Sequence, residues 1–342
     1  MLVQQIEALQ EYLSTPKRVV ITTHHKPDAD ALGSSLGFAR YLQKKGHDVS
    51  IITPSDYPRF LFWMPDEHKV IAFEGKKNKK KAAELIANAE LIACLDFSVL
   101  SRLHDLAPLV EQSSCKKLMV DHHINPENFA EFVYHNDKAA ATAELIYELI
   151  ELLGDKNLID VAIGECLYAG MMTDTGSFRH PSTTPQVHRI AANLLELGVN
   201  TNLIHRKIFD SASVSRMKFL GFVLSEKLVV LPEYRVAYFA VTSEELKRYN
   251  SQTGDTEGVV NFALQIEGIV MAAIFVDRVD AIKISFRSVE EFAVNELAST
   301  YFNGGGHKNA AGGKTEGISL QDTVQRFLDL LPKYKETLLK VP

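Results

Sequence analysis

Short apolar runs recur along the first part of the chain and alternate with segments in which apolar residues have helical spacing. Four of these runs predict buried strands, and they cover residues 19–23, 49–53, 91–96 and 117–121. Helical spacing separates several of them. Because strands that alternate with helices form parallel sheets, the pattern predicts an α/β fold with helices on both faces of a parallel sheet.

The pattern changes twice in the rest of the chain. Helical periodicity first dominates 142–153, 158–172 and 185–197, and then passes into a polar stretch. Strand pairs follow at 228–231, 236–241, 269–276 and 281–287, with a helix near 289–301. Because 342 residues exceed one ordinary core, we expect a parallel-sheet domain at 1–199, a connector at 200–214 and a smaller α+β domain at 215–342.

Composition limits the partners that the chain can take. The net charge of −6 argues against a broad electrostatic grip on long nucleic acid, so an anionic substrate has to be held in a pocket. Five lysines within 76–81 fit a solvated helix start. No apolar run is long enough to span a bilayer, and the amphipathic N-terminus lacks the features of a signal peptide. Three cysteines without CxxC spacing fit a reducing compartment, so we expect a cytoplasmic protein without a membrane partner.

Acidic residues and histidines gather where the predicted strands end. They are His24, Asp28 and Asp30 after the first strand, Asp96 at the end of the third, Asp121, His122 and His123 at the end of the fourth, and Asp174 just past an apolar helix. The carboxyl ends of parallel strands lie at one edge of a sheet, so we expect these side chains to meet there. Carboxylates at such a density repel one another unless cations lie among them.

The types and number of these donors predict two divalent ions. Aspartate oxygen and imidazole nitrogen without thiolate suit Mn²⁺ better than structural zinc. Two ions about 3.5–4 Å apart that share a carboxylate satisfy more donors than one ion can, and such pairs serve displacement at phosphorus. We expect His24 and Asp28 to bind one ion and Asp30 to turn toward the second. Gly33 is expected to let the following helix begin close to the cluster.

Five motifs along the chain resemble those of a known family. In order they read "HHKPDADALGS", "LDFS", "VDHH", "TDTGSFRHP" and "FNGGGHKNAAGG". The first four resemble the motifs of the DHH phosphoesterases, and the last resembles the glycine-rich signature of the DHHA1 domain. Among the members, the resemblance is strongest to stand-alone bacterial enzymes that cleave short oligonucleotides to mononucleotides and remove the 3′-phosphate of 3′-phosphoadenosine 5′-phosphate. It implies a hydrolase that depends on two Mn²⁺ ions.

The resemblance also implies a role for each matching residue. His24, Asp28 and Asp96 would bind the first Mn²⁺, and Asp30, Asp96, His122 and Asp174 the second. His123 would face the scissile phosphate and act with Asp96 and Asp174 in catalysis. Arg287, Gly304, Gly305, Gly306 and His307 would hold another phosphate of the substrate, and consecutive glycines and an arginine fork suit an anion. Asp121 is expected to support His122 from behind, because metal-bound histidines donate their other N–H to a carboxylate or carbonyl. No role is assigned to His25 or Arg179.

The sequence leaves other functions open. The motifs do not separate cleavage of short oligonucleotides from cleavage of linear or cyclic diadenylate. A manganese pyrophosphatase shares the N-terminal motifs, but its second domain differs from the glycine-rich one found here. A module that senses nucleotides without hydrolysis is a third alternative, against which the intact set of donors argues. A homodimer is the assembly that we consider for this chain.

Overall fold

Two compact units make up the chain, over residues 1–211 and 212–342. The computed structural model describes residues 3–252 and 254–341. The boundary between the units falls within the predicted connector, 200–214, which contains a helix, α8 (Thr201–Phe209). Asn200 caps this helix by accepting the N–H of Leu203 at 3.0 Å, so the polar residues there begin a helix.

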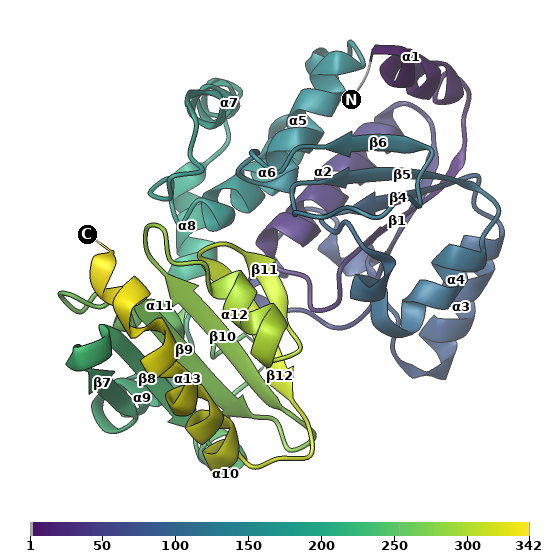
Figure 1. The fold of residues 1–342 in the computed structure, drawn as a ribbon. Coiled ribbons are helices and arrows are strands. Elements are labelled where there is room, and N and C mark those ends of the chain that lie inside the picture. The colour runs from purple at the N-terminus through teal and green to yellow at the C-terminus, as the bar shows by residue number, and fades with distance from the viewer. Residues whose placement is uncertain (1–2, 253, 342) are drawn as a thin grey trace. The chain divides into compact units, whose positions relative to one another are not determined.

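A six-stranded parallel sheet forms the centre of the first unit, in the order β3-β2-β1-β4-β5-β6 (Figure 1). Its strands are β1 (Arg18–Thr23), β2 (Asp48–Thr53), β3 (Ile71–Ala72), β4 (Leu91–Leu95), β5 (Lys116–Asp121) and β6 (Phe132–His135). The four predicted strands are confirmed to within one residue at each end. The strand order reverses between β1 and β4, and open α/β sheets bind ligands at the carboxyl ends of the strands on either side of such a point.

Helices cover both faces of this sheet, and each face has its own core. The helices are α1 (Val3–Tyr12), α2 (Ala29–Lys44), α3 (Gly75–Ala87), α4 (Ala107–Gln112), α5 (Thr142–Leu152), α6 (Val161–Asp174) and α7 (Pro185–Glu196). Side chains alternate along β1, so Val19 and Ile21 join the core under α2, α5 and α6, whereas Val20 joins the core under α3 and α4. The predicted α/β architecture is therefore confirmed.

Close packing of α2 on α6 requires small residues. A Cβ at Gly33, in the second turn of α2, would collide with the backbone carbonyl of Cys166 in α6. The described role of Gly33 is therefore this contact with α6, and Asp28 is the N-cap of α2; that Gly33 lets the helix begin close to the cluster stays a prediction. Helix α6 ends at Asp174, so this residue lies in the last turn rather than beyond the helix.

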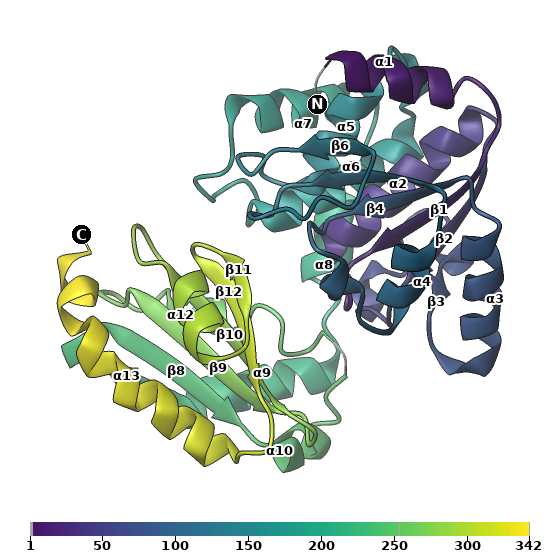
Figure 2. The same cartoon turned by 45° about the vertical axis from the view of Figure 1, so that its right-hand side comes forward.

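The second unit is a smaller mixed sheet with helices on both faces (Figure 2). Its strands are β7 (Leu228–Leu231), β8 (Val236–Val241), β9 (Met271–Asp277), β10 (Ile282–Ser288), β11 (Gly305–His307) and β12 (Ala310–Thr315), in the order β11-β12-β10-β9-β8-β7. Only the β8–β9 pair is parallel among these described strands. The helices are α9 (Val214–Glu226), α10 (Ser243–Arg248), α11 (Val259–Ala263), α12 (Val294–Tyr301) and α13 (Leu320–Lys340). One core lies under α12 and α13, and the other lies under α9 and α11.

Two expectations from composition can be compared with this fold. Five lysines occupy the first turns of α3, with their side chains exposed, as a solvated helix start requires. Among the helices described, none is long and apolar enough to cross a membrane.

Candidate metal centre

Polar side chains from three strand ends meet at the point where the strand order of the first sheet reverses. His24 directly follows β1, Asp96 directly follows β4, and His122 directly follows β5. Asp96 takes a left-handed backbone conformation with φ +65°, which turns its side chain away from the strand direction. All three side chains are buried, at 6%, 2% and 4% residue exposure, so unbalanced charge there is costly.

One group of donors surrounds His24. Its Nε2 lies 3.4 Å from Oδ2 of Asp96 and 3.9 Å from Oδ2 of Asp28. Asp28 uses its other oxygen, Oδ1, to accept the N–H groups of Asp30 and Ala31 at the start of α2. The helix cap thus holds Asp28 with Oδ2 toward the group, and the donors of this group lie close enough together to hold one ion.

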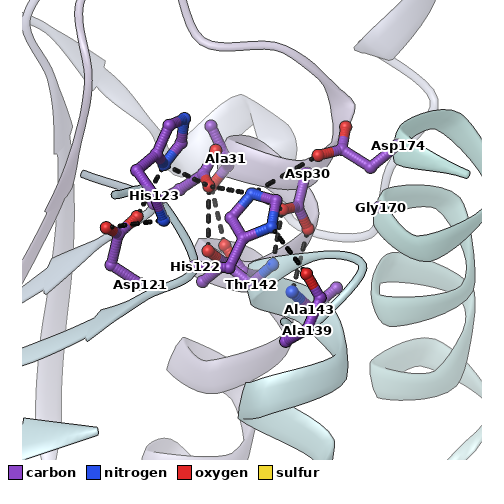
Figure 3. Close-up of polar contacts among 12 residues, drawn as sticks. Asp30, Ala31, Asp121, His122, His123, Ala139, Thr142, Ala143, Gly170 and Asp174 are labelled. Atoms are coloured by element: carbon purple, nitrogen blue, oxygen red, sulfur yellow. Dashed lines mark hydrogen bonds and ion pairs between the residues drawn. The ribbon is translucent and has the colours of Figure 1, made fainter. Parts of the chain in front are cut away.

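A second group surrounds His122 (Figure 3). Its Nε2 lies 3.5 Å from Oδ2 of Asp174, 3.9 Å from Oδ2 of Asp30 and 3.5 Å from Oδ1 of Asp96. Asp96 therefore directs Oδ2 toward the first group and Oδ1 toward the second. A carboxylate that faces two donor groups with its two oxygens has the arrangement that a bridging ligand needs.

The N-terminus of α5 holds two buried carboxylates, those of Asp30 and Asp96. Asp30 accepts the N–H of Thr142 at 2.6 Å and the N–H of Ala143 at 2.8 Å (Figure 3). The hydroxyl of Thr142 donates to Oδ1 of Asp96 at 2.8 Å. Gly170 of α6 leaves room for Asp30, because a Cβ there would collide with its Oδ1. The free N–H groups and positive end of a helix thus stabilise carboxylates that lack contact with water.

The imidazoles are oriented by hydrogen bonds of their Nδ1 atoms. Nδ1 of His24 lies 3.0 Å from the carbonyl oxygen of His25, and Nδ1 of His122 lies 3.2 Å from that of Ala139. A proton on Nδ1 leaves Nε2 with its lone pair directed at the carboxylates, as a metal-binding histidine requires. The expected partner of His122, Asp121, instead accepts from Nδ1 of His123 at 2.7 Å and from its backbone N–H at 3.0 Å. The expectation that Asp121 supports His122 is therefore wrong.

The buried charges shift one another's pKa values. Burial raises the pKa of Asp30, and the charges of Asp96 and Asp174 raise it further, to well above its usual value. Burial also acts to raise the pKa of Asp96, but hydrogen bonds with His122 and His24 outweigh it and hold this pKa well below its usual value. Burial lowers the pKa of His122, whereas the hydrogen bond with Asp96 and the charges of Asp96 and Asp30 raise it to about 10. A proton on His122 thus balances the charge of Asp96 in the metal-free protein.

Arg287 and His307 lie on the same face of the second unit's sheet. Arg287 of β10 is paired with Ala310 of β12, and Ala310 is paired with His307 of β11. Directly opposed residues of antiparallel strands point to one face, so both side chains point to the same face from strands on either side of β12. Both residues are half-buried. This arrangement allows one anion to contact both side chains.

Two of the three glycines before His307 lie too close to neighbouring backbone to carry a side chain. A Cβ at Gly304 would collide with the carbonyl oxygen of Gly312, and one at Gly306, which has φ +138°, with that of Ala310. The N–H of Gly304 donates to the carbonyl of Ala298 at 3.1 Å, so it does not face a substrate. Of the three glycines, Gly305 is the one at which a side chain would meet open space.

Both units match models of known protein families. Residues 18–171 match the DHH family, N-terminal domain, and residues 233–336 match the DHHA1 domain. The chain is 31% identical over 312 residues to the bifunctional oligoribonuclease and PAP phosphatase NrnA of Thermus thermophilus, with 91% of this chain and 88% of that protein covered. The chain belongs to the DHH family. The resemblance seen in its five motifs is therefore confirmed.

Two other similar proteins extend this comparison. A crystal structure of an exopolyphosphatase-related protein from Bacteroides fragilis is similar with a TM-score of 0.93 at 36% identity, and 98% of each chain is covered. The cyclic-di-AMP phosphodiesterase GdpP of Geobacillus thermodenitrificans is 25% identical over 347 residues, which cover 96% of this chain and 49% of that protein. NrnA and GdpP are hydrolytic enzymes, and the chain belongs with such DHH phosphoesterases.

Sequence reasoning missed the residues of α5 that hold two carboxylates of this DHH site. Thr142 and Ala143 are absent from the predicted set although they bind Asp96 and Asp30. A threonine at the first position of a predicted helix is the one signal that the sequence offers, and it equally fits an ordinary helix start. Arg179, to which no role was assigned, donates through Nε to the carbonyl of Gly176 at 2.8 Å.

Proposed function

We propose that this DHH protein is a phosphohydrolase that depends on two Mn²⁺ ions. Its substrates in this proposal are short oligonucleotides, cleaved to mononucleotides, and 3′-phosphoadenosine 5′-phosphate, from which it removes the 3′-phosphate. The single observation that carries the proposal is the carboxylate of Asp96, whose two oxygens face two separate groups of oxygen and imidazole donors. The similarity to NrnA over 91% of the chain supports the choice of substrates.

The residues present fit a pair of divalent ions in number and type. His24 and Asp28 would hold the first ion, Asp30, His122 and Asp174 would hold the second, and Asp96 would bind both. Carboxylates and imidazoles without thiolate suit Mn²⁺. Two such ions, when bound, supply Lewis acidity to the phosphate and make water a nucleophile at neutral pH.

The other proposed site residues position the substrate and move a proton. Asp121 holds His123 through Nδ1, so Nε2 is the ring atom that exchanges a proton with the phosphate ester. Arg287 binds a phosphate that does not react, because a guanidinium donates two parallel hydrogen bonds to phosphate oxygens. His307 and the N–H groups near Gly305 add to that grip. A cytoplasmic location and a homodimer remain predictions of the same proposal.

A panel of substrates tests the proposed function. The protein is incubated with Mn²⁺ and, separately, with a dinucleotide, a five-residue RNA, 3′-phosphoadenosine 5′-phosphate, cyclic diadenylate and pyrophosphate, and the products are separated. Mononucleotides from both RNAs and release of phosphate from 3′-phosphoadenosine 5′-phosphate are the expected results. Release of phosphate from pyrophosphate alone, or binding without any product, would contradict the proposal.

Cleavage of diadenylate is the second candidate. The similarity to the cyclic-di-AMP phosphodiesterase GdpP over 96% of this chain favours it, although that relative is about twice as long. Conversion of cyclic diadenylate at a rate well above that of the dinucleotide would favour this candidate. Conversion of linear but not cyclic diadenylate fits the first proposal, because linear diadenylate is itself a short oligonucleotide.

A further inference from the structure

A pocket of about 300 Å³ lies in the first unit beside the candidate metal centre. It is formed by residues that follow β1, β2 and β3, by the start of α3, and by a short helix at Leu100–Leu106. Its lining residues with aromatic or charged side chains or imidazoles are His25, Phe73, Glu74, Lys79, His104 and Asp105. None of them is a proposed metal ligand, although His25 directly follows His24.

Two stacked histidines form one wall of this pocket. The ring centroids of His25 and His104 lie 4.2 Å apart, with 23° between the ring planes. The backbone N–H of His25 donates to the carbonyl of Arg102 at 2.8 Å, which joins the loop after β1 to the short helix. The pair thus presents a flat aromatic surface one residue from the first group of metal donors.

The backbone at His104 is strained. Its φ is +49° and its ψ is −125°, a combination that a side chain rarely adopts and that glycine adopts without penalty. Strain of this kind persists where the surroundings hold it, and it concentrates at sites that bind or react. An imidazole at this position keeps its ring on that of His25.

The charges around the pocket select the kind of ligand. Lys79 lies 3.2 Å from Asp105 and 5.1 Å from the centre of the Phe73 ring, so its charge is balanced by a carboxylate and it packs on an aromatic face. Glu74 adds a second carboxylate to the lining. A phosphate group would meet carboxylates without a surplus of cations. An uncharged, flat, heteroaromatic ring fits better, because it can stack on imidazoles and hydrogen-bond to these polar groups.

We propose that this pocket binds a nucleobase of the substrate, and that His104 is a residue on which the base stacks. This inference rests on the proposed function, since it assigns a place to one base of the oligonucleotide whose phosphate reacts at the metal centre. Stacking accepts any base, so the pocket contributes affinity for nucleotides without selecting a sequence.

Replacement of His104 by glycine tests the inference and relieves the backbone strain. The ligands are a dinucleotide and two analogues that each lack one base. Binding to wild type and variant is measured by calorimetry in chelator, and kinetics are measured with Mn²⁺. We expect His104→Gly to weaken binding and raise the KM for the dinucleotide by about 5- to 100-fold, the range for loss of base stacking, with little change in kcat. For one of the two analogues, the variant and the wild type should then behave alike.

His68→Ala is the matched control, since His68 is an exposed histidine of the same unit outside the pocket, and it should leave all values unchanged. Equal losses for the dinucleotide and for both analogues, or no loss at all, would overturn the inference. Failure of the proposed function gives a different result, in which the wild type cleaves nothing. The calorimetric comparison in chelator then still decides whether His104 binds a base.

Discussion

Thr142 offers a sharp test of how the metal centre is built, because its hydroxyl contacts a proposed ligand while the residue itself binds no ion. It is fully buried at the start of α5, and its hydroxyl donates to Oδ1 of Asp96 at 2.8 Å. Thr142→Val keeps the branched shape and the backbone N–H that Asp30 accepts. It removes the hydroxyl that donates to the side chain of Asp96.

Two independent estimates give the size of the effect. A hydrogen bond to a charged group contributes about 1.5–3 kcal/mol. Loss of a partner that orients a metal ligand weakens metal binding by about 10- to 100-fold, which corresponds to about 1.4–2.8 kcal/mol. We therefore expect the dissociation constant for Mn²⁺ to rise by about 10- to 100-fold in Thr142→Val. Activity should fall at limiting Mn²⁺ and recover substantially when Mn²⁺ is in excess.

The assay is titration of Mn²⁺ by calorimetry, with thermal unfolding measured with and without metal. Thr142→Ser restores a hydroxyl and should bind Mn²⁺ nearly as wild type does. Thr315→Val is the matched control, because Thr315 is a buried threonine of the second unit whose hydroxyl bonds that of Thr323 at 2.7 Å. It should lower thermal stability without changing Mn²⁺ affinity. Wild-type Mn²⁺ affinity in Thr142→Val would refute the reasoning.

Four further predictions concern the charges of the site. Asp96→Asn removes a charge without volume and should reduce turnover below about a tenth of wild type with an unchanged circular dichroism spectrum; more activity than this would contradict a bridging role. Chelator should abolish hydrolysis, and Mn²⁺ should restore it better than Zn²⁺; full activity in chelator would contradict metal dependence. Because the pKa of His122 is raised to about 10 in the metal-free protein, Mn²⁺ must displace a proton, so affinity should rise between pH 6 and pH 8 by about tenfold per unit for each proton released. Calorimetry in buffers of different ionisation enthalpy measures that proton, and its absence would contradict the prediction. Arg287→Ala should lower kcat/KM on short oligonucleotides by about 10- to 100-fold but leave Mn²⁺ affinity and a generic phosphodiester almost unaffected. Equal losses on both substrates would place Arg287 at the reacting phosphate.

The apolar pattern predicted the central strands because a strand that is buried on both faces needs mostly apolar residues. β1 and β4 each pair with a strand on either side; β4 is apolar throughout, and β1 has an apolar Val-Val-Ile run followed by two buried threonines. The edge strands β3 and β6 have two and four residues, and their neighbours in the sheet define them more than their own composition does. The sequence therefore predicted the layer architecture and missed the width of the sheet.

The donors were predictable for a topological reason. Each follows a strand or lies at a helix end, and parallel topology brings such positions to one edge. Their supports were not predictable in the same way. Thr142 binds Asp30 across 112 residues of sequence, and no local pattern indicates which helix end will meet which carboxylate. The same holds for Asp121, which contacts His123 and not the expected His122. The conformation of the turn after β5 decides which of these two adjacent histidines it contacts, and no local pattern indicates that conformation.

The carboxylates and imidazoles that would bind cations in this centre also bind protons. Asp30 has two backbone N–H donors and a raised pKa, whereas Asp96 lies among imidazoles and has a lowered one. Hydrogen bonds from α5 therefore do not cancel the cost of burying Asp30 or the repulsion that it meets from Asp96 and Asp174, and positive charge must come from elsewhere. Protonated His122 supplies it when no metal is bound, but an imidazole cannot bind a metal ion through a nitrogen that carries a proton. Two divalent ions in place of these protons would free Nε2 of His122 and lower the charge repulsion among the carboxylates of the two donor groups, of which Asp30 and Asp96 are buried.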